Sequence, residues 1–191
     1  LSTSTSVNWM PREYPSPYMQ QWSLNIQRAI WSEAVVEVGY LGTRGVHLGM
    51  NYNLNQVPAQ LLGPGNAQSR RPYPEVNSIT TVRNGPVGAS TYHALHIRVE
   101  RRLAGGFGMQ AAYTLSKSID NCSGVADWLD FGFANVQDNY NLRAERSIAG
   151  FDITHNLGYN FIWQLPVGKG RKYLNHGGAL GYVLGGWNLS A

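Results

Sequence analysis

One feature constrains the fold more than any other. Residues 93–118 alternate between apolar and polar side chains with a period of two, interrupted once by a pair of glycines. The apolar set is Leu95, Ile97, Val99, Leu103, Phe107, Met109, Ala111, Tyr113 and Leu115. Because successive side chains of a β-strand point to opposite faces, this pattern predicts an antiparallel hairpin with one apolar and one polar face. Whether the apolar face contacts a protein core or lipid decides the class of protein.

The same alternation marks further strands. It predicts strands over about 19–30, 34–46 and 151–165, and a sixth strand that begins near Trp187. The expected fold is therefore all-β, with about six long antiparallel strands in meander order.

The connections between these strands alternate in length. Short turns join the strands of each hairpin, whereas the connections at 47–91 and 119–150 contain about 45 and about 32 residues. Loops this long are uncommon in compact soluble domains, but outer-membrane barrels combine short periplasmic turns with long outer loops. The connection at 166–186 is also long and departs from the alternation.

Strand length supports a partial transmembrane β-barrel. A strand of about 11 residues is about 37 Å long, and a tilt of about 45° reduces its span to about 26 Å. The apolar band of outer-membrane barrels is about 25 Å tall, whereas strands of soluble proteins usually contain about five or six residues.

Two faces follow from this interpretation. We expect the polar face to line the lumen through Glu37, His96, Arg98 and Glu100. We expect the opposite face to contact lipid or form the interfacial aromatic girdles, through Trp22, Trp31, Leu95, Ile97, Val99, Phe107, Tyr113 and Trp163. The loops outside these strands also carry residues that could contact a ligand. These are Arg70, Arg71, Tyr73, Trp128, Asp130 and Tyr140.

Composition excludes several classes of protein. Only 14% of the residues are charged, no stretch is long and apolar enough for a membrane helix, and the net charge of +4 is spread without the basic cluster that nucleic-acid binding requires. The chain begins at Leu1 without a signal peptide and ends as a strand pattern begins, so we expect a piece of a longer protein.

No motif predicts catalysis, a cofactor or a metal. The glycines and lysine at 168–170 lack the spacing of a phosphate-binding loop, and the five histidines lack zinc spacing. Acidic residues at 120, 127, 130 and 138 could bind calcium, but they lack EF-hand spacing, so we expect solvated loop acids instead. We therefore expect a protein that is not an enzyme.

A family resemblance adds to this interpretation. Ordered segments of the chain resemble the C-terminal half of Oar-like TonB-dependent transporters, which are abundant in Acidobacteria-like bacteria. These segments are "QQWSLNIQR" (20–28), "VEVGYLGTRGVHL" (36–48), "RRPYPEVNSIT" (70–80), "YHALHIRVERRLAGGFGMQAAYTLSKSID" (92–120), "DNYNLRAERSIAGFDITHNLGYNFIWQLPVGKGRKYL" (138–174) and "GGWNLSA" (185–191).

The resemblance implies a location and a set of partners. The complete protein would lie in the bacterial outer membrane and would carry a carboxypeptidase-regulatory-like N-terminal domain, a plug and a barrel of about 22 strands. It would import a large or scarce nutrient with energy from the TonB complex, through an N-terminal region that residues 1–191 do not include. Its partners would be membrane lipid, the remaining strands, the plug, the TonB complex and an unknown nutrient.

Two other classes remain open from the residues alone. A soluble β-sandwich that binds or adheres would bury the apolar face on a second sheet. A β-rich hydrolase would need converging acid, base or nucleophilic residues, and the alternating pattern supplies none.

Overall fold

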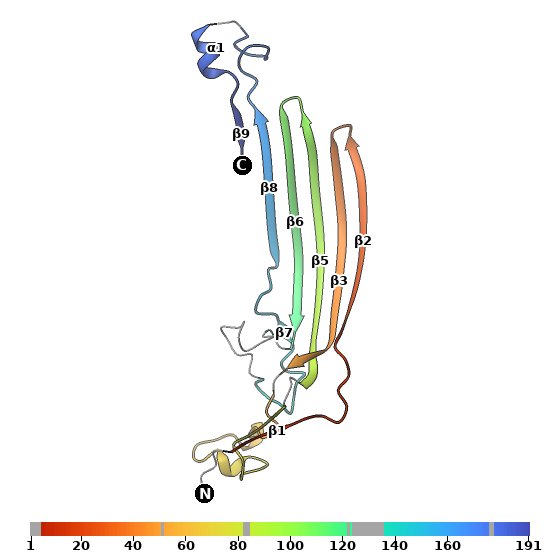
Figure 1. Ribbon diagram of the computed structural model, residues 1–191, viewed down its shortest axis with the longest axis vertical. Coiled ribbons are helices and arrows are strands. Elements are labelled where there is room, and N and C mark those ends of the chain that lie inside the picture. The colour runs from red at the N-terminus through yellow and green to blue at the C-terminus, as the bar shows by residue number, and fades with distance from the viewer. Residues whose placement is uncertain (1–4, 51, 82–84, 122, 124–135, 176–177) are drawn as a thin grey trace. The chain divides into compact units, whose positions relative to one another are not determined.

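The computed structural model describes residues 5–50, 52–81, 85–121, 123, 136–175 and 178–191. Within these ranges, strands dominate and helical structure is short (Figure 1). The strands are β1 (Ser6–Trp9), β2 (Tyr18–Trp31), β3 (Ala34–Met50), β4 (Ser78–Thr81), β5 (Gly85–Ala104), β6 (Phe107–Asp120), β7 (Ser147–Ile148), β8 (His155–Gln164) and β9 (Asn188–Ser190). The helical elements are η1 (Ala59–Leu61), η2 (Gln68–Arg70) and α1 (Ala179–Leu184).

The long strands form one sheet in the order β2-β3-β5-β6-β8-β9, and the short strand β7 pairs with β6. Neighbouring long strands run in opposite directions, as the arrows in Figure 1 show. The all-β antiparallel meander predicted from the sequence is thereby confirmed. In the described part of the chain the sheet stays open, with β2 and β9 as its edges.

Contacts divide the chain into two compact units. We call the first the loop unit because it contains both long connections; it comprises Leu1–Trp22, Gly42–His93 and Lys117–Ile153. We call the second the turn unit because it contains the short turns; it comprises Ser23–Leu41, Ala94–Ser116 and Thr154–Ala191.

Tight turns set the geometry of the turn unit. Gly105 and Gly106 have φ angles of +62° and +85°, which suit the two central positions of a type I′ hairpin turn. Glycine reaches this left-handed region without the steric cost that a Cβ would add. The amide of Arg102 donates to Glu33 O at 2.9 Å, and the amide of Gln164 donates to Gly106 O at 2.7 Å. Both turns and the end of β8 therefore lie at one end of this unit.

The register between β6 and β8 keeps the two faces separate. The apolar or aromatic residues pair with one another, as Phe107↔Trp163, Met109↔Phe161, Ala111↔Tyr159 and Tyr113↔Leu157. Most of the alternate pairs are small or polar, as in Gln110↔Asn160 and Thr114↔Asn156, and Gly108↔Ile162 is the exception with one large apolar side chain. Since a slip of one residue would exchange the faces, this register carries the predicted alternation from one strand to the next.

Two strands extend well beyond their predicted bounds. The strands β3 and β5 extend to Met50 and from Gly85, so both enter the predicted loop at 47–91. The left-handed backbone at His47 (φ +57°) interrupts the alternation where the sequence predicted that the strand would end. Glycine lets the extended strands approach closely, because a Cβ at Gly88 would lie 2.7 Å from Leu48 O.

The C-terminal part also differs in detail. β8 begins at His155, four residues later than predicted, and the connection at 166–186 contains the short helix α1. The predicted sixth strand is present as β9, which spans only three residues.

The loop unit is organised around a fully buried side-chain amide. Asn55 has no exposed surface, and its Nδ2 donates to Tyr73 O at 2.9 Å and to Val76 O at 2.8 Å. Its Oδ1 accepts from the amide of Tyr73 at 2.9 Å. One side chain therefore holds together the two ends of a loop about twenty residues long. Beside it, β1 and β4 form a parallel pair in which Ser6 lies opposite Ser78.

Replacement of Asn55 by Ala tests this hub. The substitution removes three hydrogen bonds and leaves the Tyr73 amide without its partner, which costs about 1–3 kcal/mol if the amide stays unsatisfied. The two carbonyls each keep one bond, to the Val76 amide and to Gln68 Nε2. We expect faster amide hydrogen exchange in residues 56–77 of the membrane-embedded protein, measured by mass spectrometry. Asn77→Ala is the matched control, because Asn77 is exposed on the same loop and makes none of the three bonds. Equal exchange in both variants would contradict the role of Asn55.

Candidate functional site

The polar wall of the turn unit is a band of paired polar and charged side chains. His96 Nε2 lies 3.5 Å from Glu37 Oε1, and Arg98 Nη2 lies 3.0 Å from Glu100 Oε2. With the Gln110 amide oriented so that its oxygen accepts, Arg98 Nε and Nη2 donate to it at 3.1 and 3.0 Å. The structure thus places the four residues that the sequence assigned to the lumen in two pairs on β3 and β5, and Gln110 on β6 joins the second pair. Their side chains are all partly exposed.

A glycine on β3 makes room for this band. A Cβ on Gly39 would collide with the side chains of His96 and Asn25, which reach over it from the two neighbouring strands. Glycine in a strand interior often marks such a close approach. The absence of a side chain at this position therefore lets polar groups from β2 and β5 approach one another across β3.

The opposite face is apolar and exposed. In the turn unit, Phe107 stacks on Phe161 with ring centroids 6.5 Å apart, and the guanidinium of Arg101 lies 5.5 Å from the Phe107 ring centroid. The hydroxyl of Tyr113 lies 2.8 Å from His155 Nδ1. An Arg at the apolar face beside a turn therefore has an aromatic partner.

In the loop unit, too, a glycine of β3 makes room for a large side chain, here on the apolar face. Trp22 and His93 approach with ring centroids 6.2 Å apart. A Cβ on Gly42 would collide with the Trp22 indole, so the ring covers the backbone of β3. The predicted girdle residue Trp22 therefore packs on the strand surface.

Two long connections are joined in the loop unit by hydrogen bonds. Gln56 Nε2 donates to Gln137 O at 2.7 Å, and the Asn139 amide donates to Gln56 Oε1 at 2.7 Å. Asn139 Nδ2 donates to Asn53 O at 2.6 Å, and the Tyr140 hydroxyl lies 2.9 Å from Gln56 O. The two loops therefore act as one platform rather than as independent segments.

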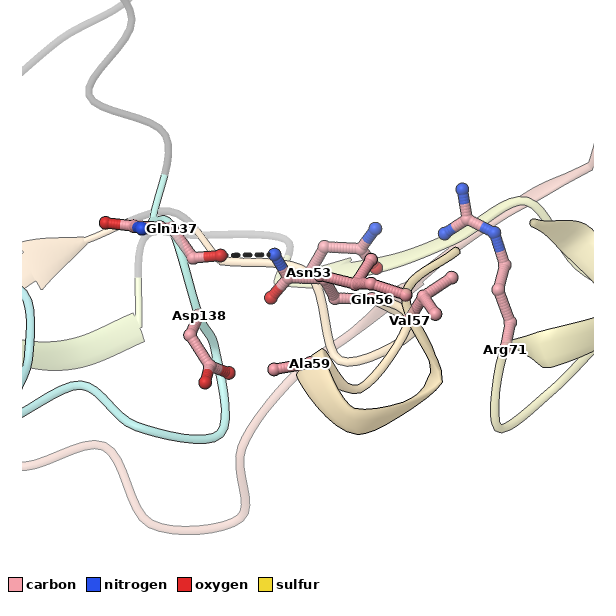
Figure 2. A pocket seen from close by; sticks show the side chains of 8 residues that line it. Asn53, Gln56, Val57, Ala59, Arg71, Gln137 and Asp138 are labelled. Atoms are coloured by element: carbon pink, nitrogen blue, oxygen red, sulfur yellow. Dashed lines mark hydrogen bonds between the residues drawn. The ribbon is translucent and has the colours of Figure 1, made fainter. Parts of the chain in front are cut away.

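A cavity of about 310 Å³ lies where these loops meet (Figure 2). Its lining combines polar and apolar side chains: Asn53, Gln56, Val57, Ala59, Leu62, Arg71, Gln137 and Asp138. In Figure 2, Asp138 and Arg71 stand on opposite sides, with Val57 and Ala59 between them. Arg71 Nε and, on the neighbouring residue of the second loop, Asn139 Oδ1 are buried without a hydrogen-bond partner among the described residues. Such atoms favour a polar ligand or ordered water at this place.

The predicted ligand-contacting residues have different surroundings. Arg70 donates four hydrogen bonds, at 2.7–3.3 Å, to the carbonyls of Leu61, Gly63, Gly65 and Asn66, so its guanidinium holds the loop together. Arg71 lines the cavity and donates to Asn55 O at 2.6 Å. Trp128 and Asp130 lie outside the described residues.

The two tyrosines stand beside the cavity rather than in its lining. Tyr73 is 56% exposed, and its backbone is bound to Asn55. The pKa of Tyr140 is raised above the ordinary value by burial, and secondarily by the negative charge of Asp138 and by Tyr73. A neutral Tyr140 hydroxyl remains able to donate to the carbonyls of the first loop.

Seven lining residues were not predicted as ligand contacts, and the polar ones among them are Asn53, Gln56, Gln137 and Asp138. These four belong to irregular segments without periodicity, and the bonds of Asn53 and Gln56 to the second loop join residues more than eighty positions apart. No local pattern in the sequence reveals such a pairing.

Metal ligands do not cluster in the described part of the chain. No group of three or more His, Cys, Asp or Glu residues forms there. Asp120 and Asp138 are described, whereas Asp127 and Asp130 are not. Within the same ranges, no helix is long and apolar enough to span a bilayer.

Comparison with known proteins gives a family. The outer membrane beta barrel domain matches residues 1–191. No curated protein and no solved structure shows a significant match. Because the family match spans the whole chain and agrees with the open antiparallel meander, the chain belongs to the outer membrane beta barrel domain family and lies in the bacterial outer membrane.

Proposed function

We propose that this chain forms part of the wall of a TonB-dependent transporter that binds and imports a large or scarce nutrient. Membership of an outer-membrane barrel family argues against the soluble β-sandwich alternative. The chain's resemblance to Oar-like transporters supports the more specific assignment, together with the separation of a polar wall, an apolar face and a joined loop platform.

The observation that carries the proposal is the register between β6 and β8. Large side chains lie next to one another on one face and are exposed: Leu157 is 65% exposed and Tyr159 is 67% exposed. A continuous apolar surface of this kind is unfavourable in water but suits the hydrocarbon region of a bilayer. We therefore assign Leu95, Ile97, Val99 and their neighbours in register to the lipid side.

The polar face then lines the lumen. A charged residue at the lipid-facing midplane costs about 2–4 kcal/mol, whereas lumen positions tolerate charge. The pairs Glu37–His96 and Arg98–Glu100 satisfy one another and leave partly exposed oxygens and nitrogens for a polar ligand or for a plug. The open edges at β2 and β9 require pairing with the remaining strands of a complete barrel.

The loop platform is the proposed site of nutrient capture. Its cavity presents a carboxylate, a guanidinium and several amides around a small apolar floor. Such a lining suits a polar ligand with hydroxyl, amide or charged groups. In this role the chain binds and conducts without catalysis, and neither a cofactor nor a metal is needed.

Two adjacent alanines test the face assignment. Ala111 pairs with Tyr159 on the apolar face, and Ala112 pairs with Gly158 on the polar face. We expect Ala111→Arg to reduce the free energy of unfolding in lipid bilayers by about 2–4 kcal/mol, and Ala112→Arg to change it by less than about 1 kcal/mol. The measurement is denaturant unfolding of the complete protein in liposomes. Equal losses of stability in the two variants would remove the assignment of the faces. A larger loss for Ala112→Arg would reverse it.

Energy coupling has its own test. The complete protein should carry a plug and an N-terminal TonB box upstream of the barrel. We expect outer membranes that contain it to retain the purified periplasmic domain of TonB, and we expect deletion of the box to abolish this retention. Retention that is unchanged by the deletion, or a complete reading frame without a plug, would contradict TonB-dependent transport while leaving the barrel assignment intact.

A further inference from the structure

A second cavity in the loop unit lies where β5 and β6 enter the loops. Its volume is about 270 Å³. The lining residues are Val87, Ala89, Thr91, Ile119, Asp120, Asn121, Leu142, Arg143 and Arg146. None of the six loop residues predicted to contact a ligand belongs to this set, although Asp120 is one of the acids considered for calcium.

The cavity is built by side chains that hold the strand ends together. Asn121 Oδ1 accepts from the Ala89 amide at 2.7 Å, and Asn121 Nδ2 donates to Val87 O at 3.1 Å. On the other side of β6, the short strand β7 pairs Ile148 with Ile119. This pairing brings the segment that contains Arg146 beside the end of β6.

Four of the five lining residues that β5 and β6 contribute belong to the apolar register, and the fifth, Asp120, belongs to the polar register. β5 contributes Val87, Ala89 and Thr91, which are alternate residues in the same register as His93. His93 contacts the predicted girdle residue Trp22. In β6, Ile119 shares its register with the exposed Lys117. A ligand bound here would therefore approach from the membrane side rather than from the lumen.

The charged groups of the cavity favour an anion. Among the described residues, neither the Arg143 nor the Arg146 guanidinium forms an ion pair or a hydrogen bond, and both side chains are exposed. The single acid of the lining, Asp120, is 5% exposed, and its carboxylate accepts from Ser123 Oγ at 3.0 and 3.2 Å. Two arginines without a partner in the described part of the chain thus oppose one carboxylate that already accepts from a hydroxyl.

We propose that this cavity binds a phosphate group of an outer-leaflet lipid headgroup. Arg143 and Arg146 bind the phosphate, because a guanidinium matches the geometry of its oxygens. Val87, Ile119 and Leu142 contact the apolar part next to the headgroup. Long barrel loops lie on the outer side of the membrane, so the phosphate belongs to that leaflet. The inference rests on the assignment of the apolar register to lipid, which the Ala111 and Ala112 substitutions test separately.

The test uses the complete protein in phosphatidylcholine nanodiscs. Fluorescent lipid A, a phosphorylated outer-membrane glycolipid, is the probe, and its partition onto the protein gives the affinity. We expect Arg143→Gln and Arg146→Gln each to weaken binding by about tenfold, as loss of a charge-assisted contact predicts. Arg12→Gln is the matched control, since Arg12 is exposed in the loop unit and does not line the cavity. It should leave the affinity unchanged.

Two further measurements separate the possible sources of binding. Dephosphorylated lipid A should bind no better than phosphatidylcholine, and inorganic phosphate should not displace the probe at millimolar concentration. Equal affinity for the dephosphorylated lipid, displacement by inorganic phosphate, or unchanged binding in both arginine variants would each overturn the proposal. Arg143→Lys, which keeps the charge but loses the two-pronged geometry, should retain part of the affinity and provides a readout if a glutamine variant does not fold.

Discussion

Inside a bilayer no water is available to form hydrogen bonds with the backbone of a strand. The rest of this structure depends on that constraint. Each N–H and C=O within the apolar band must pair with a neighbouring strand, so long antiparallel strands are required. Once strands pair, every second side chain faces lipid and every other one faces away. The pairs Ala111↔Tyr159 and Ala112↔Gly158 show how one register step separates two environments.

Glycine adapts this sheet to large side chains on both faces. At Gly39 the absence of a Cβ admits His96 and Asn25 on the polar face, and at Gly42 it admits the Trp22 ring on the apolar face. Each position lies within β3, where glycine would otherwise weaken a strand. The entropic cost of glycine is offset by side chains from neighbouring strands that cover the exposed backbone.

The sequence predicted the sheet far better than the loops, for a physical reason. Alternation is a local property, so residues 107–115 suffice to predict which side chains share a face. The loop platform depends on contacts such as Gln56 with Gln137, whose partners are distant in the chain and belong to segments without periodicity. Arg70 illustrates the difference: its position in a polar aromatic loop suggested ligand contact, whereas its donors bind four carbonyls of the same loop.

The segment at 136–146 connects the two proposed binding functions. Its first half, through Asn139 and Tyr140, is bonded to the loop that carries Asn53 and Gln56. Its second half carries Arg143 and Arg146 in the membrane-side cavity. Successive turns join the halves, because the Asn141 amide donates to Asp138 O and the Ala144 amide donates to Asn141 O, both at 3.0 Å. A headgroup bound at the second half, as proposed, would restrain the chain that positions Asp138 and so would stabilise the geometry of the first cavity without touching it.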